Sequence, residues 1–234
     1  TDGLQLIKLP FWSEKDIQNI LSAGKIMDAY ELYEAKKFPE AEKLFRECVS
    51  SYPDMILPRI NVGGSLIKQG KVKECIDFLE DSLKTSENDP LQFFIYNNLG
   101  WAYLISYTAE GLQKADDYSS KAYLLNNKHP NVLGTRACVL IEKGNIEDGL
   151  LLLKKAVKIR EPIDDKMNDP VGFIYMAYGF YLEEKYVKAR YCLDKVRKYK
   201  DKLDPDYQLV YDRILTKTEN FTKLIPSTPQ FQNA

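Results

Sequence analysis

Apolar and small residues recur along this chain at two different spacings. Within residues 181–196, Tyr186, Ala189, Leu193 and Val196 stand at i, i+3, i+7 and i+10, which places them on one face of an α-helix. On a longer scale, residues of the same kind return after 34 or 40 positions. Internal repeats of this length are typical of arrays of helix pairs. The pattern therefore predicts an all-α fold built from repeated helical units.

Small residues define the repeat most clearly. One series of small positions, with steps of 34, 40, 34 and 40, is Ala41, Cys75, Ala115, Gly149 and Ala189. A second, seven residues later with the same steps, is Cys48, Ser82, Ala122, Ala156 and Val196. A third, upstream, is Ala29, Gly63, Gly100, Ala137 and Ala177. Glycine inside a helix costs about 1 kcal/mol relative to alanine. We therefore expect close packing between the two helices of a unit to offset that cost.

The residues around Gly100 resemble the signature of the tetratricopeptide repeat (TPR) family, W-x2-L-G-x2-Y followed by A-x3-F and P. Tyr96, Leu99, Gly100 and Tyr103 match its first part, and unit one supplies Ala41, Phe45 and Pro53. The resemblance covers about 22–203 and implies a right-handed superhelix, or α-solenoid, of about five helix hairpins with a C-terminal capping helix. The units are expected at 22–55, 56–91, 92–129, 130–163 and 170–203. The additional residues of the longer steps are assigned to loops at 86–90, 108–112 and 161–170.

The segments outside the units have separate roles in this prediction. Residues 1–21 form an N-terminal segment and lead-in helix that begins at Glu14 and continues through Gly24 into unit one. Residues 204–224 form the capping helix, because a repeat array must cover its last apolar face. Residues 225–234 are expected to be a flexible tail. Because the sequence begins at Thr1, we expect it to be part of a longer protein.

Two residues depart from the repeat pattern. Ser119 stands where unit three should carry a large apolar residue, and Tyr118 is expected to rotate into the space. Arg136 stands where unit four should carry leucine. It either weakens that unit or places a charge at its edge. Gly70 and Gly144 fall in the turns within units, where a positive φ is often required.

Composition narrows the function classes. The chain has 33 Lys and Arg against 34 Asp and Glu, which gives no general reason to expect nucleic acid or an anionic membrane as a partner. No apolar run approaches the ~20 residues needed to cross a bilayer, so direct membrane insertion is not expected. The four cysteines, Cys48, Cys75, Cys138 and Cys192, are scattered. They indicate buried thiols in a reducing, cytoplasmic compartment.

The sequence carries no recognisable catalytic or metal-binding constellation. The single histidine, His129, precedes Pro130 in a turn and is expected to be a surface residue. With one histidine and no cysteine cluster, no metal site, cofactor or catalytic residue is predicted. The basic run at 185–202 has interleaved tyrosines that could suggest RNA binding. It coincides with the second helix of unit five, where a solvated outer face is the ordinary explanation.

The resemblance implies that the first helices of the units line a concave groove that binds a protein or an extended peptide. The predicted groove residues are Tyr30, Tyr33, Asn61, Asn97, Asn98, Trp101, Thr135, Tyr175, Tyr178 and Tyr181. Asn61 and Asn98 occupy equivalent positions and resemble asparagines that hold a peptide backbone in other family members. An amide can both donate and accept. The aromatic residues either anchor a ligand or fill the inside of a tightly wound superhelix.

One ligand class known for the family is not expected. Members that clamp the C-terminal carboxylate of a chaperone use basic residues and two asparagines in these positions. Here the basic positions hold Ala23, Phe94 and Asn98, one asparagine position holds Met27, and only Asn61 matches.

Three functions remain open at this point. The first is a non-catalytic protein- or peptide-binding scaffold. The second follows from residues 1–9, which loosely resemble the segment after the last membrane span of bacterial membrane-embedded zinc metalloproteases with a TPR tail. In that case the chain is a regulatory or substrate-presenting tail at the cytoplasmic membrane face. The third is a self-associating scaffold that forms homo-oligomers.

Overall fold

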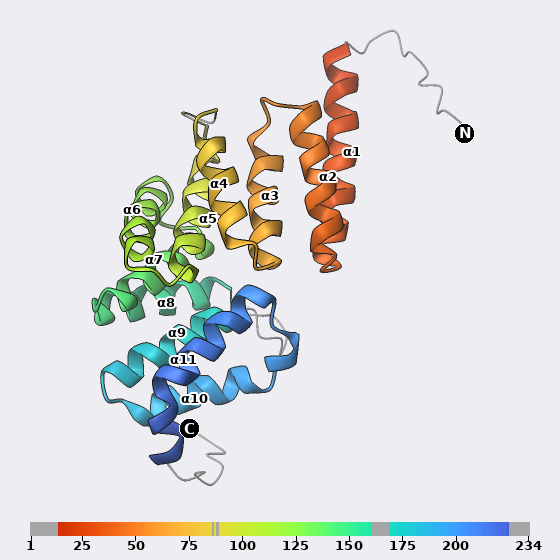
Figure 1. Cartoon of the computed structure of the whole chain (residues 1–234). Coiled ribbons are helices and arrows are strands. Elements are labelled where there is room, and N and C mark those ends of the chain that lie inside the picture. The colour runs from red at the N-terminus through yellow and green to blue at the C-terminus, as the bar shows by residue number, and fades with distance from the viewer. Residues whose placement is uncertain (1–13, 86, 88, 161–168, 225–234) are drawn as a thin grey trace.

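The described part of the chain is entirely helical. The computed structural model describes residues 14–85, 87, 89–160 and 169–224, which form eleven α-helices and one short 3-10 helix (Figure 1). In order, these are α1 (Glu14–Glu34), α2 (Phe38–Ser51), α3 (Ile56–Lys68), α4 (Val72–Leu83), α5 (Gln92–Ile105), α6 (Ala109–Leu125), α7 (Pro130–Glu142), α8 (Ile146–Ile159), α9 (Pro170–Leu182), α10 (Tyr186–Arg197), η1 (Lys200–Lys202) and α11 (Pro205–Leu224). The predicted all-α fold of five helix hairpins and a C-terminal helix is confirmed.

Helices α1 to α10 pair in sequence order into five antiparallel hairpins. Helices α3, α5, α7 and α9 begin at residues 56, 92, 130 and 170, where the sequence predicts units two to five to begin. Helix α1 continues unbroken through Gly24, as predicted. The predictions for residues 1–13, 161–168 and 225–234 lie outside the described residues.

Proline and polar caps set the starts of the later first helices. Pro130 and Pro170 occupy the first turns of α7 and α9, where a missing N–H costs nothing. The His129 side chain accepts a hydrogen bond from the backbone N–H of Asn131, and Asp169 accepts one from that of Gly172. The sequence therefore fixes where these two helices begin.

Each hairpin turns through one residue with left-handed backbone. Gly70 and Gly144 have φ of 73° and 88°, as predicted, and Lys36, Tyr107 and Glu184 have φ between 56° and 59° in the corresponding turns. Left-handed backbone is unfavourable for residues with a Cβ. Three of the five turns are therefore formed against local preference.

Small residues allow the close helix contacts that the repeat pattern predicts. A Cβ added at Gly63 would lie 2.7 Å from the side chain of Leu79. One added at Gly100 would lie 3.1 Å from the backbone nitrogen of Ser119. Helices α5 and α6 therefore approach closely at Ser119, where Tyr118 is expected to fill a space. The Tyr118 ring instead stacks on Tyr103, with centroids 5.7 Å apart.

Helix α11 turns back over the array. It packs along α9 and also reaches α3 and α5, all of which are first helices of hairpins. Val210, Tyr211 and Ile214 are almost fully buried in this contact. We call the surface of α3, α5, α7 and α9 that faces α11 the groove.

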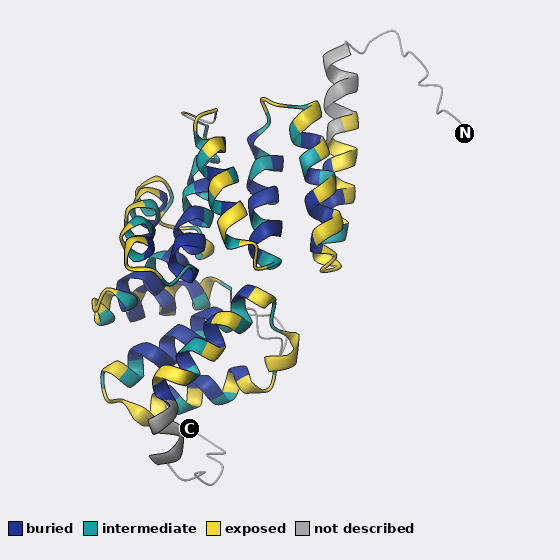
Figure 2. Ribbon diagram, viewed as in Figure 1, coloured by how far each residue is buried: buried dark blue, intermediate teal, exposed yellow. Residues whose placement is uncertain are grey.

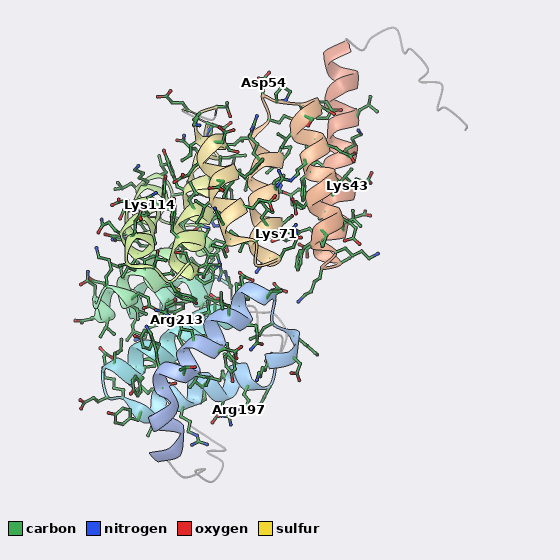
Figure 3. All side chains as sticks on the ribbon, viewed as in Figure 1. Lys43, Asp54, Lys71, Lys114, Arg197 and Arg213 are labelled. Carbon is green, nitrogen blue, oxygen red and sulfur yellow. The ribbon has the colours of Figure 1, made fainter. Side chains whose placement is uncertain are left out.

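Buried and exposed residues lie in different parts of the array. The core runs continuously through the array, and exposed residues lie on the terminal helices α1 and α11, on the second helices of the hairpins and in the turns (Figure 2). Charged side chains such as Lys43 on α2 and Arg197 on α10 project outward (Figure 3). Among the described residues, no helix combines the length and hydropathy that a membrane span requires.

Candidate functional site

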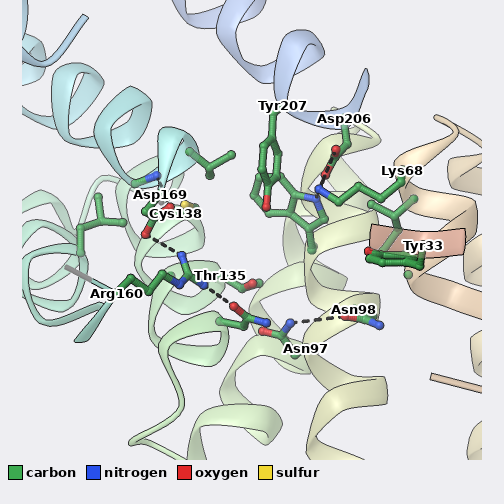
Figure 4. A pocket seen from close by; sticks show the side chains of 18 residues that line it. Tyr33, Lys68, Asn97, Asn98, Thr135, Cys138, Arg160, Asp169, Asp206 and Tyr207 are labelled. Carbon is green, nitrogen blue, oxygen red and sulfur yellow. Dashed lines mark hydrogen bonds and ion pairs between the residues drawn. The ribbon is translucent and has the colours of Figure 1, made fainter. Parts of the chain in front are cut away.

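The groove contains a cavity of about 170 Å³ that is partly open to solvent. It lies between the first helices α1, α3, α5, α7 and α9 and the start of α11, and Leu153 and Arg160 at α8 complete its wall (Figure 4). Helix α3 packs against α5, α5 against α7, and α7 against α9, so the lining comes from neighbouring units. The cavity therefore depends on the repeat architecture and on the position of α11.

One wall of the cavity holds an ion-pair network around Lys68. Its Nζ lies 3.1 Å from Asp204 Oδ2 and 3.1 Å from Asp206 Oδ1, and 3.6 Å from the centroid of the Tyr207 ring. Asp204 also pairs with Lys36 at 2.7 Å. These contacts join the start of α11 to α3 and to the turn after α1.

Burial and charge act in opposite directions on these groups. Burial alone would lower the pKa of Lys68, but Tyr207, Asp206 and Asp204 outweigh it and raise that pKa. Burial raises the pKa of Asp206 despite the nearby Lys68. Burial also raises the pKa of Tyr33 to about 12. Lys68 therefore stays charged and Tyr33 stays a neutral hydrogen-bonding group near neutral pH.

Trp101 lies beside the same network. Its indole Nε1 donates to Asp206 Oδ2 at 3.1 Å, and its ring meets Tyr207 edge-on with centroids 6.3 Å apart. The side chain is 8% exposed. Trp101 thus holds α11 while it lines the cavity.

The opposite wall holds a second ion pair. Arg160 Nη1 lies 2.6 Å from Asp169 Oδ2, and its Nη2 donates to Asn131 Oδ1. Asp169 is 6% exposed and also caps α9 through Gly172. This pair fixes the end of α8 against the starts of α7 and α9.

Amide and hydroxyl groups lie between the two ion pairs. Asn97 is 5% exposed, and its Nδ2 donates to Asn98 Oδ1 at 3.4 Å. Its Oδ1 is buried and has no hydrogen-bond partner among the described residues. Asn98 Nδ2 donates to the carbonyl of Ile60 at 3.3 Å, and Thr135 lines the cavity nearby (Figure 4).

The structure brings half of the predicted groove residues together. Tyr33, Asn97, Asn98, Trp101 and Thr135 all line the cavity. Their elements, α1, α5 and α7, converge there because successive hairpins stack side by side.

The remaining predicted residues lie elsewhere. Asn61 Nδ2 donates to the hydroxyl of Tyr30 at 2.8 Å and to the carbonyl of Leu57 at 2.9 Å, so these two side chains bind each other. Tyr175 is fully buried.

Two further tyrosines contact other parts of the chain. Tyr178 is 9% exposed and its hydroxyl accepts a hydrogen bond from Lys217 Nζ of α11 at 3.0 Å. Tyr181 is half-buried beside the Tyr186 ring. For Tyr175 and Tyr178, the interpretation that aromatic residues fill the inside of the superhelix fits the structure.

Sequence reasoning missed the charged part of the lining. Lys68 ends α3, Arg160 follows α8, Asp169 precedes α9, and Asp206 and Tyr207 lie in the first turn of α11. In the sequence these residues look like the polar residues found at the ends of many helices. Only the return of α11 across the array places them in one cavity.

The histidine and the cysteines, the other residues that could react or bind a metal, are packed within the structure. His129 is half-buried beside Phe94, with ring centroids 4.9 Å apart, so it is not a fully exposed surface residue. All four cysteines are buried and not disulfide-bonded, as predicted. Among the described residues, no group of three or more His, Cys, Asp or Glu is arranged to hold a metal ion.

Comparisons with family models and with curated proteins give no match to this sequence. Solved structures do match. A thermophilic TPR protein of Thermus thermophilus is 17% identical with a TM-score of 0.61, over 83% of this chain and 99% of that one. PilW, a type IV pilus biogenesis factor, is 17% identical with a TM-score of 0.57, over 86% and 87%.

A larger assembly contains a similar stretch. A chain of the APC/C hetero-tetramer Cut9–Hcn1 is 13% identical with a TM-score of 0.64, over 88% of this chain and 41% of that one. Similarity at this level of identity establishes the fold. The chain has the tetratricopeptide repeat fold that its sequence resembles.

Proposed function

We propose that this TPR chain is a non-catalytic protein-interaction module that binds an extended segment of a partner protein in the groove. The observation that carries the proposal is the cavity in the groove, which gathers five of the ten residues predicted to bind a partner. TPR folds present their first helices to ligands, and here the first helices of all five hairpins contribute to one partly open cavity.

The chemistry of the lining supports a polypeptide ligand. Asn98 and Thr135 offer groups that can pair with the N–H and C=O of a peptide. Trp101 and Tyr33 offer rigid apolar surface, which often dominates the energy of protein interfaces. An extended segment can use both along its length.

Gly134 provides a direct test. It lies on α7 in the cavity lining, and a Cβ added there would meet nothing within 4 Å. The side chain of Gly134→Leu therefore starts in open space on the wall of the cavity. Gly24 on α1 also has open space around its Cβ but lies outside the cavity lining, so Gly24→Leu is a matched control.

The experiment selects phage-displayed random peptides on the immobilised wild-type chain. Enriched peptides should bind wild type and Gly24→Leu equally and lose binding to Gly134→Leu. Peptides that bind Gly134→Leu as well as wild type would place the binding surface outside the cavity and contradict the proposal.

Self-association is a second candidate, because α1 leaves large apolar side chains exposed at the end of the array. Leu21 and Met27 are 42% and 61% exposed. Light scattering at increasing concentration should then show a dimer that Met27→Glu abolishes. A constant monomer mass would exclude it.

The metalloprotease interpretation depends on residues 1–9, which lie outside the described residues.

A further inference from the structure

We propose that the cavity receives one carboxamide side chain, that of a glutamine or an asparagine, from the partner segment. This inference rests on the proposed function and specifies which chemical group enters the cavity. Three features carry it: a buried amide oxygen without a partner, walls whose charges are already paired, and the size of the space.

Asn97 points to a ligand with hydrogen-bonding groups. It is 5% exposed, lines the cavity, and its Oδ1 has no partner among the described residues. Most buried polar side-chain atoms have a partner, and leaving one without is unfavourable. Asn97 Oδ1 has almost no exposed surface, so a ligand N–H donor in the cavity supplies the missing bond when the Asn97 side chain turns this oxygen toward it. Because a carboxamide carries a donor and an acceptor side by side, it complements Asn97 in either orientation of that amide.

The charges on the walls favour a neutral ligand. Lys68 pairs with Asp204 and Asp206 on one side. Arg160 pairs with Asp169 on the other. A charged ligand group would have to be buried without an opposite charge of its own, which is far more costly than burying a hydrogen-bonded neutral group. The opposite charges also leave no net sign to attract an ion.

The volume fits a side chain of this length. An apolar cavity of about 150 Å³ in another protein holds benzene, which has six heavy atoms. The cavity here is about 170 Å³. A glutamine side chain has five heavy atoms beyond Cα and an asparagine four. Thr135 lines the same space, and its hydroxyl can donate to the carboxamide oxygen.

The test uses capped amino acids as probes. N-acetyl-L-glutamine N-methylamide is titrated into the isotope-labelled full chain and followed by heteronuclear NMR at the Asn97, Asn98 and Thr135 signals. The γ-methyl ester of the matching glutamate compound has a similar size but no side-chain N–H donor. Saturable shifts should appear with the amide, and the ester should bind at least about tenfold more weakly. Equal binding of amide and ester would overturn the inference.

Two variants and one further probe complete the design. Gly134→Leu should abolish the shifts, and Gly24→Leu should keep them. Free L-glutamine carries two terminal charges that the paired walls do not accommodate, so it should bind more weakly than the capped compound. Tighter binding of free glutamine would make the cavity a small-molecule site and overturn the inference.

The two proposals fail in different ways. If selected peptides require the open cavity but keep their affinity when every Gln and Asn is replaced by norleucine, the carboxamide inference is wrong and the proposed function stands. If peptides do not require the open cavity, the proposed function itself is wrong.

Discussion

Individual residues show where local preference and fold agree and where they do not. Gly70 and Gly144 adopt the left-handed backbone that their turns require, and this was predictable from glycine alone. The equivalent Lys36, Tyr107 and Glu184 were not predictable, because their identity gives no signal for such a turn. The hairpin geometry of the repeat imposes the conformation on them.

We expect that a substitution in the turn at Glu184 can stabilise the protein. Glu184→Gly should raise the free energy of unfolding by up to about 1 kcal/mol, because it removes left-handed strain at the cost of a more flexible unfolded chain. Gly144→Ala should lower it by about 1 kcal/mol. Urea unfolding followed by circular dichroism measures both. A destabilised Glu184→Gly variant would mean that the glutamate contributes an interaction at this turn.

Asn97 is expected to serve binding rather than stability. Asn97→Leu keeps a similar shape, removes a buried acceptor without a partner and breaks only the 3.4 Å hydrogen bond to Asn98 Oδ1, so the free energy of unfolding should stay the same or rise by about 1 kcal/mol. The same variant should lose the capped-glutamine NMR shifts. A loss of stability above about 2 kcal/mol would show instead that Asn97 holds α5 in place.

At the level of elements, the two residues that depart from the repeat pattern, Ser119 and Arg136, contact each other. Arg136 of α7 donates to Asp116 Oδ1 at 2.6 Å and to the hydroxyl of Ser119 at 3.2 Å, both on α6. Lys143, which follows α7, also pairs with Asp116. The arginine in a leucine position is therefore a polar contact between units three and four. Pattern reasoning identified both departures but could not show that they meet.

This contact gives a pH-dependent prediction. Burial alone would raise the pKa of Asp116, but hydrogen bonds from Lys143 and Arg136 outweigh it and lower that pKa. A carboxyl with a lowered folded-state pKa contributes stability above its unfolded pKa, about 3.9, and loses it as pH falls through the folded value. Asp116→Asn should therefore cost about 1–2 kcal/mol at pH 7 and progressively less below about pH 4.

Unfolding in urea across this pH range measures the difference between wild type and the variant. Asp194→Asn on α10, whose ion pairs are exposed, is the control and should change stability by less than about 0.5 kcal/mol. A difference at Asp116 that does not shrink in acid would mean that its charge is not what stabilises the contact.

The helices themselves were predictable because the pattern that indicates each helix lies within its own residues. Small residues at fixed steps, such as Ala41 and Cys75, and apolar faces of period 3.6 depend only on neighbours along the chain. The path of α11 across the array, by contrast, depends on residues far away in the sequence. Its sequence predicts an amphipathic helix after Pro205, but which surface that helix covers depends on contacts with residues more than 100 positions away, such as Trp101.

At the scale of the whole molecule, α11 ties distant hairpins together. Stacked repeats contact only their neighbours, so their ends can unfold separately. Here Asp204 and Asp206 link the start of α11 to Lys36 and Lys68. The rest of α11 is packed along α9. We therefore expect the array to unfold as one cooperative unit.

Removing the carboxylates of Asp204 and Asp206 should uncouple the unfolding of the two ends of the array. The double variant Asp204→Asn and Asp206→Asn leaves Lys68 partly buried without an anionic partner among the described residues, and should cost about 3 kcal/mol. Hydrogen exchange should accelerate in α3 and α5 more than in α9. Uniform acceleration in all three helices would show that α11 does not provide the coupling.

The cavity in the groove is expected to bind another polypeptide, and on this the function of the molecule depends. Isothermal titration of the tightest selected peptide against wild type, Gly24→Leu and Gly134→Leu tests it most directly. We expect affinities for wild type and Gly24→Leu that agree within about twofold, and a loss of at least about tenfold for Gly134→Leu. Equal affinity for all three proteins would contradict it.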